Sequence, residues 1–173
     1  MPINRTPSNL NFLGPTTFDF SIVKLPTTNF FVQKCNLPGM SLPPVDFANP
    51  LVGIPLHGDH ITFERFTIQF KVDEDIKNYV ELHNWMRGLG WPNESKEFAN
   101  LNSQPLGFGL YSDAELIVLN SKHRPNFKVT FIDAFPIELS GFQMEVDVDD
   151  IVYIDATATF AYTSYNLEPY RGG

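Results

Sequence analysis

The sequence predicts a mainly β protein: an antiparallel β-sandwich or open barrel with one α-helix packed on it. Three observations favour this class. Apolar and polar residues alternate with a period of two in most patterned segments, a single segment has helical spacing, and the elements run strands, helix, strands. With 173 residues, 43% of them hydrophobic, the chain is long enough for one domain with a sizeable core.

The domain is expected to span residues 17–165. Residues 1–16 show no periodicity and predict an N-terminal arm, and residues 166–173 are expected to form a C-terminal tail. The first two strands are predicted at 18–25 and 30–36. The four residues between them suit the connection of a β-hairpin.

Residues 40–60 combine four prolines with many apolar side chains. Each proline removes a backbone donor, so helix and central strand are disfavoured. A loop of this length inside a compact domain is usually functional or disordered, and this one is too apolar for disorder. We expect another chain to bury part of it; packing on its own core is the alternative.

The longest strand is predicted over 61–73, with a one-residue slip near Glu64 that indicates a bulge. A helix is expected to follow over about 74–88. The carboxylates of Asp73-Glu74-Asp75 are expected to cap its first amides. Five residues at helical spacing form its expected buried stripe. They are Ile76, Tyr79, Val80, His83 and Met86.

Three more strands are predicted at 114–120, 127–139 and 152–163, and the stretch 91–111 has no clear pattern. Asp133 interrupts the apolar side of the second of these strands, and Pro136 favours an edge or a bend there. The last strand alternates most regularly.

The formal net charge is −8, and lysines and arginines are scattered singly. A basic stripe of the kind that binds nucleic acid is therefore not expected. The single cysteine, Cys35, excludes an intrachain disulfide and a Cys-based zinc site, and we expect it to be a small buried residue. No apolar run is long enough for a membrane span, so we expect a soluble protein without a membrane partner.

Two clusters could carry chemistry. The motif His57-Gly58-Asp59-His60 contains metal ligands, but on a loop its two histidines need not share a face, so polar loop groups or an inter-subunit contact are expected. The acidic run Glu145, Asp147, Asp149, Asp150 lacks the turn glycine and terminal glutamate of a calcium loop. We expect no catalytic activity, no metal and no cofactor.

Several segments carry a family resemblance. They are 31–39, Asn49-Pro50, His57-Gly58-Asp59, 66–79, 131–137 and 156–162. In these short sequence segments and in the order of its elements, the chain resembles the tail-tube protein family of contractile-tailed bacteriophages. That family includes baseplate tube-initiator proteins and is related in fold to the type VI secretion tube protein.

The resemblance implies a ring of six copies whose sheets join around a channel through which the genome leaves. Rings stack into a tube inside a sheath, and the long loop contacts the adjacent ring. The implied partners are further copies, the sheath and baseplate or tube-initiator proteins. DNA passes without specific binding. The implied location is the virion tail, after assembly in the host cytoplasm.

On this basis, two sets of residues are expected to be functional. The inter-ring contacts are Leu42, Val45, Phe47, Leu51, Ile54, His57 and Asp59. The lumen-facing residues are Thr67, Gln69, Lys71, Thr157 and Thr159. Neutral hydroxyls and amides would wet a channel wall without holding phosphate, and the acidic balance would repel DNA.

The main function predicted is that of a tail-tube subunit. A tube initiator or another terminal ring protein is the alternative within the family, and copy number separates the two. A monomeric carbohydrate-binding β-sandwich would also suit the aromatic, acidic composition. An enzyme built on His57, Asp59 and His60 is a third possibility.

Overall fold

A computed structural model describes residues 12–14, 17–48, 50–90, 95–102, 109–145 and 153–170 of the chain. Its elements, in order, are β1 (Phe18–Ile22), α1 (Pro26–Phe31), β2 (Val32–Cys35), β3 (Met40–Ser41), β4 (Val45–Phe47), β5 (Ile54–Leu56), β6 (Thr62–Phe63), β7 (Phe66–Lys71), α2 (Lys77–Gly90), α3 (Ser95–Asn102), β8 (Ser112–Leu119), β9 (Pro125–Leu139), β10 (Asp155–Ala161) and β11 (Ser164–Pro169). The predicted fold class is confirmed, although the described residues contain two helices besides α2. No described helix has the length and apolar character needed to cross a membrane.

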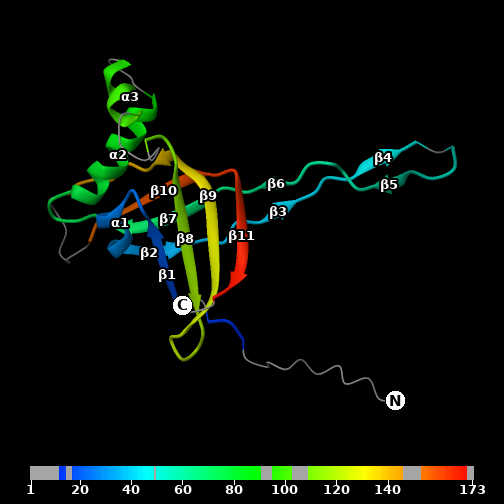
Figure 1. The fold of residues 1–173 in the computed structure, drawn as a ribbon, viewed down its shortest axis with the longest axis horizontal. Helices are drawn as coiled ribbons and strands as arrows, with labels where there is room; N and C mark the ends of the chain where they lie inside the picture. Colours follow the sequence, from blue (N-terminus) through cyan, green and yellow to red (C-terminus); the bar gives the residue numbers. More distant parts are fainter. Residues whose placement is uncertain are drawn as a thin grey trace.

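One antiparallel sheet runs β1-β8-β9-β10-β7-β2, and β11 pairs with β9 outside this path (Figure 1). The long strand β9 joins two halves of the sheet, one with β1, β8 and β11 and the other with β10, β7 and β2. Its first part pairs with β8 and β11, and its last part pairs with β10. The two halves therefore share a strand and can fold over a common core.

The bend in β9 is a β-bulge at Asp133. Ser112 pairs with Ala134 and Ala114 pairs with Phe131, so β9 carries one residue more than β8 across this interval. Asp133 has a φ of 55°, and its amide donates to Asp113 Oδ1 at 3.2 Å. The extra residue reverses the alternation, so Ala134 and Pro136 face the core beyond it. The sequence correctly places an interruption at Asp133, and beside Pro136 the register with β10 shifts between Thr159 and Phe160.

The core is centred on the ring of Phe66, the first residue of β7. It stacks on the rings of Phe131 of β9 and Phe160 of β10, with distances of 4.5 Å and 4.8 Å between ring centroids. The centroid of the Phe20 ring, on β1, lies 6.0 Å away. From α2, Trp85 lies 6.2 Å from Phe160. Phe66 thus joins strands from both halves of the sheet.

The predicted N-terminal hairpin is wrong. β1 pairs with β8 and β2 pairs with β7, so the two strands lie at opposite ends of the sheet path. The expected turn, 26–29, begins α1 instead, with Pro26 at the first turn of the helix, where its missing amide costs nothing.

Helix α2 buries a different face from the expected one. Its buried residues are Asn78, Leu82, Trp85 and Gly88. From the predicted stripe, Val80 and His83 are exposed and the other three residues are half-buried.

Asn78 explains the shift of the buried face. Its side chain donates to the Lys71 carbonyl at 2.7 Å and accepts from the Asp73 amide at 3.2 Å. Thr28 of α1 donates to the Asn78 carbonyl at 3.1 Å. These hydrogen bonds satisfy the polar groups of Asn78, which is fully buried. A prediction based on the spacing of apolar residues cannot identify a buried asparagine.

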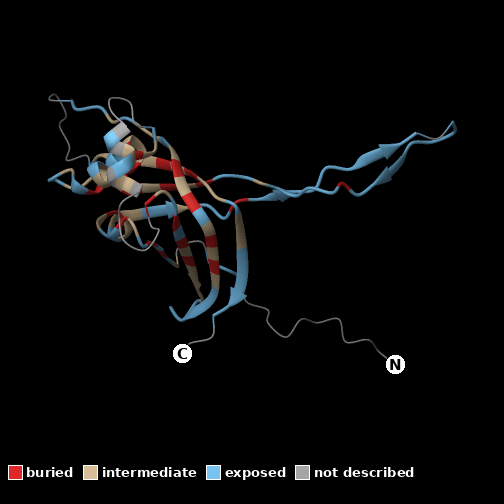
Figure 2. Ribbon diagram, turned by 45° about the horizontal axis from the view of Figure 1, so that its top comes forward, coloured by how far each residue is buried: buried red, intermediate tan, exposed pale blue. Residues whose placement is uncertain are grey.

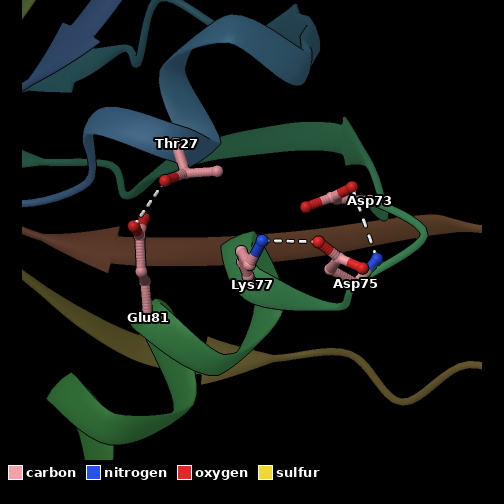
Figure 3. Close-up of polar contacts among 5 residues, drawn as sticks. All are labelled: Thr27, Asp73, Asp75, Lys77 and Glu81. Carbon is pink, nitrogen blue, oxygen red and sulfur yellow. Dashed lines mark hydrogen bonds and ion pairs between the residues drawn. The ribbon is translucent and has the colours of Figure 1, made fainter.

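The helix also begins later than predicted. Asp73 accepts at its carboxylate from the Asp75 amide, 3.4 Å, and at its carbonyl from the Ile76 amide, 2.9 Å. Ile76 has a φ of 59°, so the helix begins only at Lys77. The Asp73 carboxylate thus binds a turn amide, and Asp75 pairs with Lys77 at 2.5 Å (Figure 3). The expected cap by Asp73-Glu74-Asp75 is wrong for this geometry.

The C-terminal segment is more ordered than the sequence indicates. The domain was expected to end at residue 165, but β11 continues to Pro169 and pairs with β9 from Ile132 to Phe127. The acidic residues Asp147, Asp149 and Asp150 lie outside the described residues.

Candidate functional site

Residues 40–63, which we call the ribbon, project from the body as two antiparallel strands (Figure 1). Near the body β3 pairs with β6, and farther out β4 pairs with β5. Figure 2 shows that the ribbon is exposed along nearly its whole length. The loop expected at 40–60 is therefore a hairpin, and the described body does not bury it.

The outer part of the ribbon has one apolar face. Val45 pairs with Leu56 and Phe47 pairs with Ile54, so four apolar side chains share a side. Asp46 pairs with Pro55 on the other side. Phe47 is 60% exposed and Ile54 is 41% exposed. A two-stranded hairpin is marginally stable alone in water, and exposed apolar patches are typical of interaction surfaces.

The motif His57-Gly58-Asp59-His60 lies where the two strands differ in length. Between the inner and outer pairings, the outgoing strand has three residues, 42–44, and the returning strand has five, 57–61. Gly58 is buried in this irregularity, and a Cβ on it would lie 2.2 Å from the Pro43 carbonyl oxygen. The motif therefore has a geometric role, since only glycine permits this approach.

The side chains of the motif do not form a metal site. His57, Asp59 and His60 are exposed, and no group of three or more His, Cys, Asp or Glu side chains among the described residues is placed to hold a metal ion.

A second surface is the outward face of β7 and β10, which we call the polar face. Thr67 pairs with Thr159 and Gln69 pairs with Thr157. The next pair, Lys71 and Asp155, forms an ion pair of 2.6 Å. The alternate residues of both strands are buried in the core. All five residues predicted to line a lumen thus lie together on one side of the sheet.

The seven residues predicted for inter-ring contact all lie on the ribbon and are exposed. Leu56 completes the apolar face but was missed. The signal for it is the alternation of Val45, Phe47, Ile54 and Leu56 around an intervening turn, the pattern of a hairpin rather than a loop.

Trp85 offers no glycan platform. It is 3% exposed, its indole nitrogen donates to the Leu110 carbonyl at 3.0 Å, and the ammonium of Lys24 lies 4.8 Å from its ring centroid. Burial lowers the pKa of Lys24 to about 8. Trp91 lies outside the described residues.

Cys35 is half-buried rather than buried. Burial raises the pKa of its thiol to about 12. The thiol therefore stays protonated at neutral pH and is a poor nucleophile.

The model of one family, described as phage tail tube protein, matches residues 9–168 of the chain. The chain belongs to this family. Its role is structural and related to the tail tube, and its place is the phage tail.

A curated relative is the tail tube terminator protein of Enterobacteria phage T4. It is 26% identical over 164 residues, which are 91% of this chain and 90% of the relative. Such coverage means that the two proteins correspond nearly end to end.

Solved structures share the fold at low identity. A chain of the anti-feeding prophage cap, described as the tube terminating cap, has a TM-score of 0.62 at 10% identity, covering 98% of this chain and 100% of that one. A chain of the sixfold-symmetrised anti-feeding prophage baseplate has a TM-score of 0.62 at 11% identity, covering 94% and 97%.

Proposed function

We propose that the chain forms a closed ring of six copies at an end of a phage tail tube. The observation that carries the terminal position is the end-to-end similarity to the T4 tail tube terminator protein. Sixfold symmetry is that of the baseplate assembly whose chain shares the fold. The main-tube subunit is the second candidate, and the family's own description favours it.

In this proposal the ribbon makes the contact between rings. Its apolar face, with Val45, Phe47, Ile54 and Leu56, would dock on the neighbouring ring, and Leu42, Leu51, His57 and Asp59 would lie at the edge of that contact. Burying this face would remove the exposed apolar area and stabilise the hairpin.

The polar face would line the channel. Threonine hydroxyls and the Gln69 amide bind water, and the pairing of Lys71 with Asp155 neutralises a cation that would otherwise attract phosphate. The net charge of −8 per copy adds repulsion. DNA would thus pass without specific binding.

The remaining partners follow from the position of the ring. A terminal ring contacts tube subunits on one side, and the sheath or baseplate proteins lie beside it. Assembly would take place in the host cytoplasm, and the proposal involves no membrane partner and no catalytic step.

Copy number per particle tests the terminal position. Quantitative mass spectrometry of purified virions is calibrated against the portal or another ring of known copy number. It should return the copy number of a single ring, six per particle. A number many times larger would identify the main-tube subunit instead. Absence of the chain from the particle would refute both.

A further inference from the structure

The ribbon joins the body at a root where three aromatic rings meet. The ring centroid of Phe63, the last residue of β6, lies 5.4 Å from that of Tyr165 and 6.0 Å from that of Tyr162. The Tyr162 hydroxyl donates to the carbonyl of Glu64 at 2.6 Å. Tyr162 stands between β10 and β11, so this contact comes from outside the two strands of the ribbon.

The two strands are also tied to each other at the root. The Glu64 amide donates to the Gly39 carbonyl at 3.0 Å, and the Gly39 amide donates to Glu64 Oε2 at 3.2 Å. These bonds join the two residues that flank the ribbon, one at the body end of each strand. They hold its strands together, but they do not resist bending of the ribbon out of its own plane, because a single layer of backbone is easily bent that way.

Tyr162 is itself fixed by the core. Its ring lies 5.1 Å from Phe131 and 5.8 Å from Phe66, and both of these are fully buried. Burial, with the neighbouring Tyr165 and Glu64, raises the pKa of the Tyr162 phenol to about 12. The hydroxyl is therefore a donor throughout the physiological range.

We propose that Tyr162 is the positioning residue of the ribbon: through its hydrogen bond to Glu64 and its contact with Phe63, it sets the direction in which the apolar face points from the body. A ribbon held in one direction loses less conformational freedom when it docks. The direction itself is a property of one chain; only the docking step rests on the proposed ring.

The test is a distance distribution between two spin labels, measured by pulsed electron paramagnetic resonance. One label is attached at Val52→Cys on the outer turn of the ribbon and the other at Asp19→Cys on β1, in a Cys35→Ala background. Both host positions are exposed. Labelled chain is diluted into excess unlabelled chain, so only distances within one chain are measured, and the sample is kept below the concentration at which rings form, so docking does not hold the ribbon.

Tyr162→Phe removes the hydroxyl and keeps the ring. Tyr79→Phe is the matched control, because the Tyr79 hydroxyl also donates to a backbone carbonyl, that of Ser140 at 3.2 Å. We expect one narrow distance in the parent and in Tyr79→Phe, and a distribution at least about twofold broader or clearly shifted in Tyr162→Phe. Equal widths and means in all three proteins would overturn the proposal, as would a parent distribution that is already broad.

Circular dichroism and thermal unfolding separate positioning from folding. Each variant loses one tyrosine hydrogen bond to a backbone carbonyl, so the two should have similar unfolding temperatures. If Tyr162→Phe does not fold, Phe63→Leu is measured in its place, since it removes the aromatic contact while leaving Tyr162 intact; the same broadening is expected, and an unchanged width contradicts the proposal.

Discussion

Thr67 on β7 and Thr159 on β10 lie directly opposite each other, with their hydroxyl oxygens 3.5 Å apart. Gln69 and Thr157 form the adjacent pair on the same face. These side chains carry no charge and present hydroxyl and amide groups to water. Their arrangement is the basis for placing the polar face at the channel.

Replacing both Thr157 and Gln69 by lysine should slow genome ejection while leaving assembly intact. The two lysines would lie opposite each other, which costs about 0.2–1 kcal/mol of stability, and each could hold a passing phosphate. Because such contacts weaken as salt rises, added salt should restore the ejection rate.

The matched control is Thr157→Ser with Gln69→Asn, which alters the same pair without adding charge. Ejection kinetics are followed by fluorescence of a DNA-binding dye. If the lysine pair ejects DNA as fast as this control at low salt, these positions do not face the channel.

Phe47→Asp should leave a folded subunit whose rings do not dock on a neighbouring ring. A carboxylate on the apolar face would have to be buried without a partner, and loss of such a contact weakens binding by about 2 kcal/mol or more, roughly 30-fold. Circular dichroism reports the fold and analytical ultracentrifugation reports assembly.

Asp46→Asn is the control for Phe47→Asp, because Asp46 lies on the opposite face of the same hairpin. It should assemble normally. Unfolding of Phe47→Asp, or assembly equal to that of the control, would count against the apolar face as an interface.

Gly58→Ala should impair assembly without destabilising the core. The added methyl would meet the Pro43 carbonyl oxygen at 2.2 Å, so the ribbon must shift there. We expect the concentration for half-assembly to rise about tenfold, equivalent to about 1.4 kcal/mol.

Gly53→Ala is the paired control, since no atom of the described part of the chain lies within 4 Å of the added methyl. Light scattering against concentration compares the two variants. Equal assembly of both would remove the close approach at Gly58 from the account.

Stability should fall in alkaline solution through Tyr162. The pKa of its phenol is raised from about 10 to about 12 in the folded chain, so below pH 10 it is neutral in both states. Between pH 10 and 12 the unfolded chain loses the proton and the folded chain keeps it, and unfolding is favoured.

The contribution of Tyr162 is isolated by comparison with Tyr162→Phe. The difference in the free energy of unfolding between parent and variant, measured with urea, should be constant up to pH 10 and shrink above it. A difference in the free energy of unfolding that does not change with pH up to 12 would show that folding does not raise the pKa of this phenol.

The strands with regular alternation were predictable from sequence because one face of each is buried. In β10 the core takes Ala156, Ala158 and Phe160 while the threonines point away, and this pattern also located the polar face. The single strand predicted over 61–73 with a bulge near Glu64 is instead two strands: the chain passes there from β6, which pairs with β3, to β7 of the main sheet.

The elements that were missed depend on contacts distant in sequence. Asn78 is buried because Lys71 and Asp73 satisfy its side chain, which moved the buried face of α2. The prolines of the ribbon disguised a hairpin, since Pro55 lies in β5 opposite Asp46, where a two-stranded pairing tolerates a missing amide. Helix α3 packs on α2 through Leu101 against Gly88, and no local pattern marks that contact.

The central claim is that copies of this chain close into a ring through surfaces that the single chain leaves open. Negative-stain electron microscopy of the purified, concentrated protein tests it most directly. We predict closed rings with an open centre, single or in short stacks. Isolated particles of subunit size at every concentration would contradict the claim.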